Sequence, residues 1–339
     1  MDQPIHLRLR KGRELKRLQH MEQEMKKRGT LRAGTSGLMS ENGDIAAQCH
    51  RKAHLRQLGI EIEPPTESNQ IMWELGYLNE DSVFETLTHS LGADEIILRE
   101  EEIPTEWFTS GGTKVTGRPD MVICKKILSV EPTTGTSKVH FDPVHVLELK
   151  SVASFSTGKS VLFEREPKLA HLAQLAHYMW KTGAGKGSLV YKQYAKQAVP
   201  SWAARHLPKK GEPRSEWLEY QKDGKPGSVL PFELVYEVVI SGSKGKLQYK
   251  LETEPVSEFT ETIVSVSDIL RFYEFVAAMG TEKQLGPRPL TASASGEVAK
   301  YWSMCEARYC PLAGVCERSE ANYDKWLEEV IKQVTSGEK

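Results

Sequence analysis

The chain has 339 residues, of which 39% are hydrophobic and 27% are charged, and its formal net charge is −1. These values describe a globular protein with a sizeable core, and the near-neutral charge excludes a surface coated in basic residues. No stretch approaches roughly 18 consecutive apolar residues and the N-terminal residues lack an apolar signal core, so we expect no membrane span and no secretion.

The first part of the chain predicts helices. Residues 10–28 form a charged helical pattern that Gly29 ends, and Asp44 can cap a helix that runs to Leu58. Residues 67–91 predict a further helix.

Strand and helix patterns then alternate. Segments rich in Val and Ile predict strands at 95–103, 114–127, 144–152, 187–194, 233–241 and 246–253. Helical periodicity returns at 167–182, 256–279 and 319–334. Residues 200–228 are rich in Pro, Gly and Lys and predict a long exposed loop. Helices around a central run of strands indicate an α/β fold with a mixed core.

Two stretches of the neutral chain are basic. Residues 1–32 hold ten Lys or Arg against four Asp or Glu, and residues 181–214 hold eight against Glu212 alone. Such stretches can follow a polyanion such as DNA. A solvated helix face or a charged loop is the alternative for each.

A carboxylate pair with a lysine is the first chemical signal. Side chains alternate along a strand, so Glu148 and Lys150 share one face while Leu147 and Leu149 take the other. Asp120, on a neighbouring strand-like segment, can add a second carboxylate. Two carboxylates favour Mg²⁺ or Mn²⁺, which can assist hydrolysis of a phosphodiester.

The spacing of Glu148 and Lys150 is not specific by itself. Glu-x-Lys occurs four times in the chain, but only this copy lies in an apolar strand that follows a strand with Asp120. A surface ion pair on an edge strand is the alternative interpretation.

The next helix carries Gln174 and Tyr178, which lie four residues apart on one helical face. Asp120, Glu148-Leu149-Lys150 and Gln174-x-x-x-Tyr178, in this order, resemble the motifs of PD-(D/E)XK nucleases of the RecB type. The resemblance implies a restriction-endonuclease-like core with a mixed central sheet flanked by helices. It also implies that Gln174 and Tyr178 face the active site and help to place DNA, whereas the alternative is a helix whose polar residues face solvent.

The cysteines extend the resemblance. Cys49 precedes the nuclease motifs, and Cys305, Cys310 and Cys316 follow them. This arrangement is similar to the iron–sulfur subgroup, which includes CRISPR-associated exonucleases and the AddB nuclease domain. It implies a 4Fe–4S cluster that joins the N- and C-terminal segments. Structural zinc and no metal stay open as alternatives, although zinc sites usually show two close pairs of ligands. Cys124, within a strand, is expected to be a packing residue.

The first metal motif departs from the family pattern. The family often has Gly-x-x-x-His, whereas Glu80 stands four residues after Gly76 here. A carboxylate can ligate the same cation, so we expect Glu80 to be a metal ligand, and a solvent-facing glutamate is the alternative. The expected ligand set is Glu80, Asp120, Glu148 and the backbone carbonyl of Leu149.

DNA contacts are expected from the basic stretch after this helix. Its cations alternate with Tyr191, Tyr194 and Trp202, and such a pattern suits phosphates and unpaired bases. A solvated insertion whose aromatic rings pack on the core is the alternative. The residues expected to bind DNA are Lys192, Lys209, Lys210 and Arg214.

The sequence as a whole predicts a Mg²⁺- or Mn²⁺-dependent DNA exonuclease that acts on single strands or DNA ends in recombination, repair or replication. A structure-specific endonuclease or nickase and a non-catalytic DNA-binding protein of the same fold are the alternatives. The expected domains are a basic helical extension (1–35), the nuclease domain (36–318) and a C-terminal helix (319–339).

The chain has no GxxxxGK[ST] motif, so a helicase or recombination partner would be a separate chain. The odd number of cysteines and the missing signal indicate the cytoplasm, or the host cytoplasm for a viral protein.

Overall fold

A computed structural model shows how these segments fold. The residues that the structure describes are 28–60, 67–99, 102–130, 136–152, 166–193, 233–252, 258–285, 312–318 and 322–336, with positions 11, 12, 15, 19 and 161. The helix expected at 10–28 lies mostly outside the described residues, and the loop expected at 200–228 lies wholly outside them.

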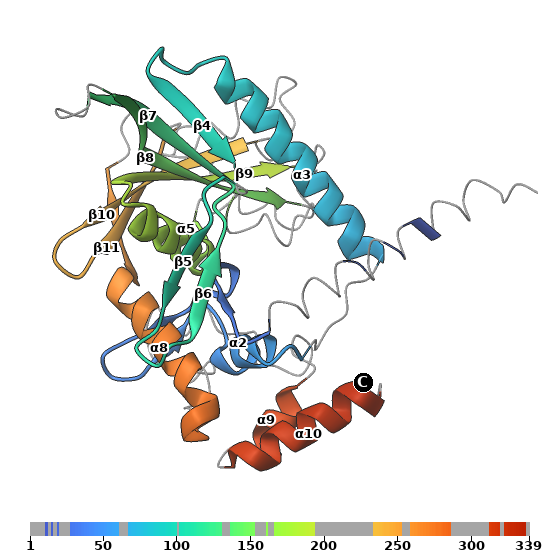
Figure 1. Ribbon diagram of the computed structural model, residues 1–339. Helices are drawn as coiled ribbons and strands as arrows, with labels where there is room; N and C mark the ends of the chain where they lie inside the picture. Colours follow the sequence, from blue (N-terminus) through green and yellow to red (C-terminus); the bar gives the residue numbers. More distant parts are fainter. Residues whose placement is uncertain are drawn as a thin grey trace, which may run out of the picture.

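A seven-stranded mixed sheet forms the centre of the fold (Figure 1). In spatial order its strands are β12 (Thr260–Ser265), β11 (Lys246–Leu251), β10 (Glu233–Ser241), β9 (Lys186–Gln193), β8 (Ser137–Val152), β7 (Met121–Val130) and β4 (Glu95–Arg99). The β8–β9 pair is parallel and the other pairs are antiparallel. The prediction of an α/β fold with a mixed central sheet flanked by helices is therefore confirmed.

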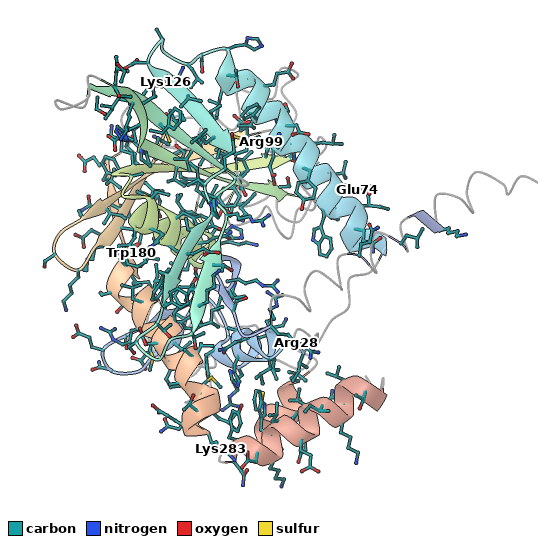
Figure 2. The ribbon with its side chains drawn as sticks, viewed as in Figure 1. Arg28, Glu74, Arg99, Lys126, Trp180 and Lys283 are labelled. Carbon is teal, nitrogen blue, oxygen red and sulfur yellow. The ribbon has the colours of Figure 1, made fainter. Side chains whose placement is uncertain are left out.

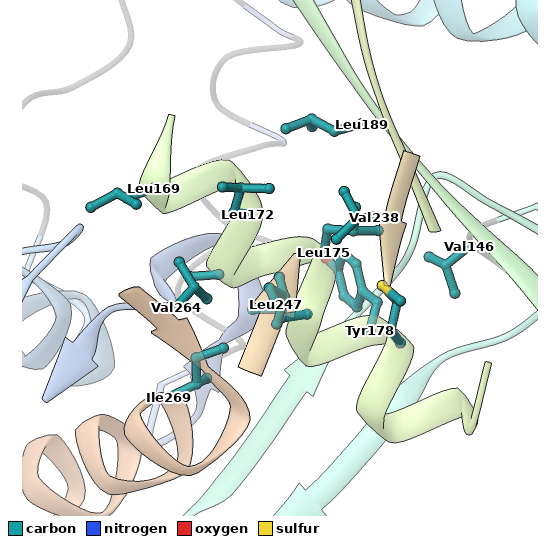
Figure 3. Packing of buried hydrophobic residues seen from close by; sticks show 14 of the residues in the cluster. Val146, Leu169, Leu172, Leu175, Tyr178, Leu189, Val238, Leu247, Val264 and Ile269 are labelled. Atoms are coloured by element: carbon teal, nitrogen blue, oxygen red, sulfur yellow. The ribbon is translucent and has the colours of Figure 1, made fainter. Parts of the chain in front are cut away.

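The parallel pair requires a crossover, which helix α5 (Leu169–Thr182) supplies. Its apolar side packs into the main core, and Figure 3 shows Leu172, Leu175 and Tyr178 of α5 among residues of the sheet. The helix ends where Gly183 adopts φ +78°, a left-handed conformation that glycine adopts without steric cost.

Helix α3 (Glu67–Thr88) covers the other face of the sheet. Val83, Phe84 and Leu87 pack against a cluster that includes Leu147 and Leu149 of β8. The expected alternation along β8 is thus confirmed, because these two leucines face α3.

Shorter elements pack against α5 and α8. A three-stranded sheet orders β1 (Leu31–Arg32), β6 (Lys114–Gly117) and β5 (Thr105–Phe108). The two-residue strands β2 (Leu38–Met39) and β3 (Ile45–Ala46) form a hairpin, and the 3₁₀ turn η1 (Ala33–Thr35) follows β1. Leu31 and Ala33, from the segment expected to be an extension, are buried in the main core.

Helix α8 (Val266–Glu282) packs against α5 and α2 (His50–Gln57). At its N-terminus the Ser265 Oγ accepts a hydrogen bond from the Asp268 N–H at 3.1 Å, which is a favourable cap.

The C-terminal helices join the N-terminal part of the chain. Helices α9 (Ala313–Arg318) and α10 (Tyr323–Ser336) lie beside α2 (Figure 1). His54 Nε2 of α2 lies 2.7 Å from the hydroxyl of Tyr323, and Leu55 belongs to a buried cluster with Trp326 and Val330. Segments far apart in sequence thus share one small core.

Two predicted helix starts are wrong. Asp44 belongs to the β2–β3 turn, where its N–H donates to Ser40 Oγ at 3.0 Å, and α2 begins at His50. The helix expected from 256 begins at Val266, because residues 260–265 pair with β11 as strand β12. Within the described part of the chain, no helix is long and apolar enough to cross a membrane.

Candidate functional site

Asp120 joins β7 to the strand that carries the expected catalytic residues. Met121 pairs with Leu147, so the residue before Met121 stands opposite Glu148 in this antiparallel register. The Leu149 N–H donates a hydrogen bond to Asp120 Oδ2 at 2.6 Å. The structure therefore fixes the Asp120 carboxylate beside Glu148, as the sequence predicted.

Glu148 is fully buried on the face of β8 opposite Leu149. One carboxylate oxygen, Oε1, accepts a hydrogen bond from Lys150 Nζ. The other oxygen, Oε2, is buried and has no hydrogen-bond partner among the residues that the structure describes. Burial, and then the nearby Asp120 carboxylate, raise the pKa of Glu148 to about 8. The Lys150 ammonium compensates this charge at Oε1, and a cation bound at Oε2 would stabilise the ionised form further.

Lys150 is the partner of this carboxylate and is 24% exposed. Burial opposes its ammonium form, but the Glu148 and Asp120 carboxylates outweigh burial and raise the pKa of Lys150. Lys150 is therefore a cation next to two acidic side chains, with part of its surface open to solvent.

Helix α3 brings Glu80 to the same region. The neighbouring Asn79 donates from Nδ2 to Ser151 Oγ at 2.9 Å, which anchors α3 to the end of β8. The Glu80 carboxylate adds to the raised pKa of both Glu148 and Lys150, so it lies within electrostatic reach of them.

Helix α5 carries Gln174 and Tyr178, and Tyr178 lies within electrostatic reach of the Glu148 and Asp120 carboxylates. Gln174 Nε2 donates to the Tyr178 hydroxyl at 3.2 Å. Tyr178 is buried, and its burial, together with the Glu148 and Asp120 carboxylates, raises the pKa of its hydroxyl well above the usual value. The Tyr178 ring packs directly against the backbone of β6 at Gly117. A side chain larger than glycine would collide with the ring there, because its Cβ would lie 2.6 Å from Tyr178 Cε1. The expected catalytic residues thus come together from three parts of the chain.

Two further residues, Tyr191 and His171, lie at this site. The Tyr191 ring was expected to suit unpaired bases, but it is buried in the main core, as the alternative interpretation of that stretch stated. The hydroxyl of Tyr191 lies 2.9 Å from His171 Nδ1 and accepts a hydrogen bond from the Lys168 N–H at 3.1 Å. Tyr191 pairs with Lys150 across the β8–β9 register. Burial, followed by the positive charge of Lys150, lowers the pKa of His171 well below the usual value. The parallel pairing that creates this neighbourhood has no local signal in the sequence.

The carboxylates of Asp120 and Glu148 can be compared with the ligands that a divalent cation requires. Two carboxylates, one with a buried oxygen that has no partner among the described residues, suit a hard divalent ion. Among the side chains that the structure describes, no three or more His, Cys, Asp or Glu are grouped so as to hold a metal. The fit therefore rests on the pair of Asp120 and Glu148 rather than on a closed cage of side chains.

The cysteines are only partly described. Cys49 is the N-cap residue of α2, Cys316 lies in α9, and both are half-buried. Cys316 packs against the cluster that contains Leu55, so the C-terminal segment lies against the helix that follows Cys49. Cys305 and Cys310 lie outside the described residues. Cys124 is buried in the main core, as expected of a packing residue.

Of the expected DNA contacts, Lys192 is described. Its Nζ donates to Ser82 Oγ of α3 at 3.1 Å, so this cation stands at the end of the sheet near Glu80. Lys209, Lys210 and Arg214 lie outside the described residues.

The fold and the site define a mixed α/β protein in which a buried glutamate, a half-buried aspartate and a lysine lie together at the end of the central sheet. No family model matches the chain, and no curated protein matches it. A solved structure described as "Crystal structure of SSO0001" is 20% identical, covers 55% of this chain and 72% of its own, and has a TM-score of 0.34. A similarity of this size carries no conclusion about fold family or function.

Proposed function

We propose that the chain is a metal-dependent DNA exonuclease with a restriction-endonuclease-like core. The observation that carries the proposal is the fully buried Glu148, whose Oε2 lacks a partner in the described part of the chain while Asp120 and Lys150 lie beside it. A buried ion pair with an extra carboxylate is a costly way to stabilise a sheet. The same arrangement has a clear use when a divalent cation binds the two carboxylates.

The metal ligands in this proposal are Asp120, Glu148, Glu80 and the backbone carbonyl of Leu149. Bound Mg²⁺ or Mn²⁺ would polarise a phosphoryl oxygen and activate water for hydrolysis. The hydrogen bond from the Leu149 N–H holds the Asp120 carboxylate in place, so that this ligand loses little conformational freedom on binding.

The other residues orient the substrate and the nucleophile. Lys150, a cation in contact with Glu148, can orient a water molecule or stabilise charge that develops on the phosphate. Gln174 and Tyr178 are held against each other and can help to place the DNA backbone. Lys192, at the end of β9, can neutralise a phosphate.

We also propose a 4Fe–4S cluster held by Cys49, Cys305, Cys310 and Cys316. The contact of α9 and α10 with α2 supports it, because Cys316 and Leu55 of the helix that follows Cys49 share a small core, while Cys49 itself packs against the main core. The cluster would act as a clasp between the ends of the nuclease domain rather than as a catalyst. A helicase or recombination protein, as a separate chain, is the expected partner.

The test is degradation of end-labelled DNA, single- and double-stranded, linear and circular, with Mg²⁺ or Mn²⁺ and with EDTA as the control. We expect progressive shortening of linear DNA from an end, no cutting of circles and no reaction in EDTA. Cutting of circular DNA would show an endonuclease or nickase instead. Binding without cleavage under all these conditions would show a non-catalytic DNA-binding protein.

A further inference from the structure

Helix α3 carries two exposed aromatic side chains in line with Glu80. Trp73 is 43% exposed and Tyr77 is 57% exposed. Positions i, i+4, i+7 and i+11 of an α-helix follow one stripe, so Trp73, Tyr77, Glu80 and Phe84 share a face of α3. This stripe leads from the two rings to the carboxylate at the candidate site.

The surroundings of the stripe change along the helix. Phe84 packs on the sheet, and Asn79 is bonded to Ser151 close to the end of β8. Figure 1 shows α3 passing the ends of β8 and β9 and continuing beyond them. Glu74, labelled in Figure 2, stands on this projecting part. Trp73 and Tyr77 are exposed because the helix extends past the sheet that covers its C-terminal half.

We infer that Trp73 and Tyr77 form a stacking platform for the unpaired bases of a DNA strand whose backbone enters the site at Glu80. The inference rests on the proposed function and names the form of substrate that the site takes. Any base can stack on an aromatic ring, so the platform holds a strand without reading its sequence.

The spacing suits a strand that leads to the carboxylates. With a rise of about 1.5 Å per residue, Tyr77 is about 6 Å along the helix axis from Trp73, and Glu80 is about 4.5 Å further. Each ring can therefore hold one base of the strand while the next phosphate approaches Glu80. Bases within a duplex are paired and stacked on each other, so a duplex offers no face to these rings.

The acidic residues of α3 indicate that this helix would bind a DNA strand by stacking on its bases rather than by contacts with its phosphates. Asp81 is paired with Arg99 at 2.7 Å. Glu74 and Glu85 directly follow Trp73 and Phe84, so each lies about 100° around the helix from the stripe. A platform beside acidic residues holds a polyanion through its bases. Two cations near this helix already have partners on it, since Arg99 pairs with Asp81 and Lys192 is bonded to Ser82.

The experiment measures binding of a labelled oligothymidine by anisotropy in EDTA, where no cleavage competes. The variants are Trp73→Leu and Tyr77→Leu, which keep an apolar side chain, and Trp73→Phe and Tyr77→Phe, which keep a ring. Leu78→Ala is the matched control, because Leu78 is 63% exposed on the same helix but lies about 100° from Tyr77. Circular dichroism melting curves check that each variant is folded.

We expect each leucine variant to bind the oligonucleotide about tenfold or more weakly, and each phenylalanine variant to recover most of this loss. The slope of log affinity against log salt stays unchanged in the leucine variants, because no phosphate contact is removed. In Lys192→Gln, by contrast, the slope falls by about 0.7. Affinity for a blunt duplex of the same length stays the same in the leucine variants.

Two outcomes overturn the platform. One is that the wild-type protein does not bind the oligonucleotide, and the other is that the leucine variants bind it as tightly as Leu78→Ala does. If either occurs in a protein that degrades DNA with Mg²⁺, the nuclease proposal stands and the platform alone falls. If the rings control binding but no DNA is cleaved, the platform stands and the nuclease proposal falls.

Discussion

The Leu149 N–H donates a hydrogen bond to the side chain of Asp120 at 2.6 Å. This bond ties the start of β7 to the strand that presents Glu148 and Lys150. The contact makes the carboxylate pair a rigid feature of the sheet rather than two independent side chains. A rigid pair loses little entropy when it binds a cation or a substrate.

Removal of a carboxylate should therefore abolish the chemistry and leave the fold. Glu148→Gln keeps the size of the side chain and removes the buried charge, so we expect cleavage to fall by at least about 10²-fold while DNA binding is retained. Asp120→Asn should act in the same way. The matched control is Glu106→Gln, in an exposed ion pair with Lys114, which should cleave normally. Near wild-type cleavage by Glu148→Gln would show that the reaction occurs elsewhere.

Substitution of Glu80 tests whether a glutamate ligates the metal where PD-(D/E)XK nucleases of the RecB type often have a histidine. Its carboxylate contributes to the electrostatics of Glu148 and Lys150, so Glu80→Gln should raise the Mg²⁺ concentration needed for half-maximal cleavage. Glu85→Gln, on the exposed side of the same helix, is the control and should leave this concentration unchanged. An unchanged metal dependence in Glu80→Gln would place the first metal motif in another segment.

Tyr191 is expected to position Lys150. Tyr191→Phe removes the hydroxyl that contacts His171 and accepts from the Lys168 N–H. It should lower the free energy of unfolding by about 1–3 kcal/mol, because a backbone donor loses its partner. We expect kcat to fall with KM for DNA unchanged, because the ring still packs but His171, which lies within electrostatic reach of Lys150, loses its contact with the hydroxyl. Tyr249→Phe, on β11 of the same sheet, is the control and should leave kcat unchanged. A rise in KM with kcat unchanged would assign Tyr191 to DNA binding instead.

Local patterns predicted the residues of the site better than its geometry. Glu148, Lys150 and the two leucines between and beside them follow from strand alternation, and Gln174 and Tyr178 follow from helical spacing. The contact of His171 with Tyr191 depends on the parallel pairing of β8 with β9, which only the tertiary fold decides.

The two wrong helix starts have a similar cause. Asp44 is a good capping residue, but its N–H is used in the β2–β3 turn. Residues 260–265 pair with β11, and a strand partner outside the local window cannot be seen in helical periodicity.

The proposed 4Fe–4S cluster should give the protein a colour. Protein purified without oxygen should be brown with four irons per chain, and Cys305→Ala or Cys310→Ala should remove the colour and lower the melting temperature. Cys124→Ala is the control, since Cys124 is buried in the main core. It should keep the colour and lose stability only through the small cavity. A colourless protein with stoichiometric zinc would replace the cluster with a structural zinc site.

Acid sensitivity is expected from His177, which is buried among Trp107, Trp180 and Tyr273. Neither of its ring nitrogens has a hydrogen-bond partner within the described ranges. Burial, and then the charge of Lys181, lower its pKa from 6.5 to about 3. Between these two pH values the unfolded chain holds a proton on this residue that the folded protein lacks. Stability is therefore lost as the pH falls through this window, by up to several kcal/mol from this group.

His177→Phe keeps an aromatic ring and removes the titrating group, so it should unfold at nearly the same temperature at neutral pH and lose less stability on acidification. His50 has a similarly low pKa of about 3 through burial, but its Nε2 is bonded to the Leu285 carbonyl at 2.6 Å. His50→Phe should therefore destabilise the protein even at neutral pH, because the Leu285 carbonyl loses its closer partner and keeps only the longer bond from Arg51 Nε at 3.4 Å. Urea unfolding at several pH values measures both effects. An equal acid dependence in His177→Phe and the wild type would assign the acid sensitivity to other groups.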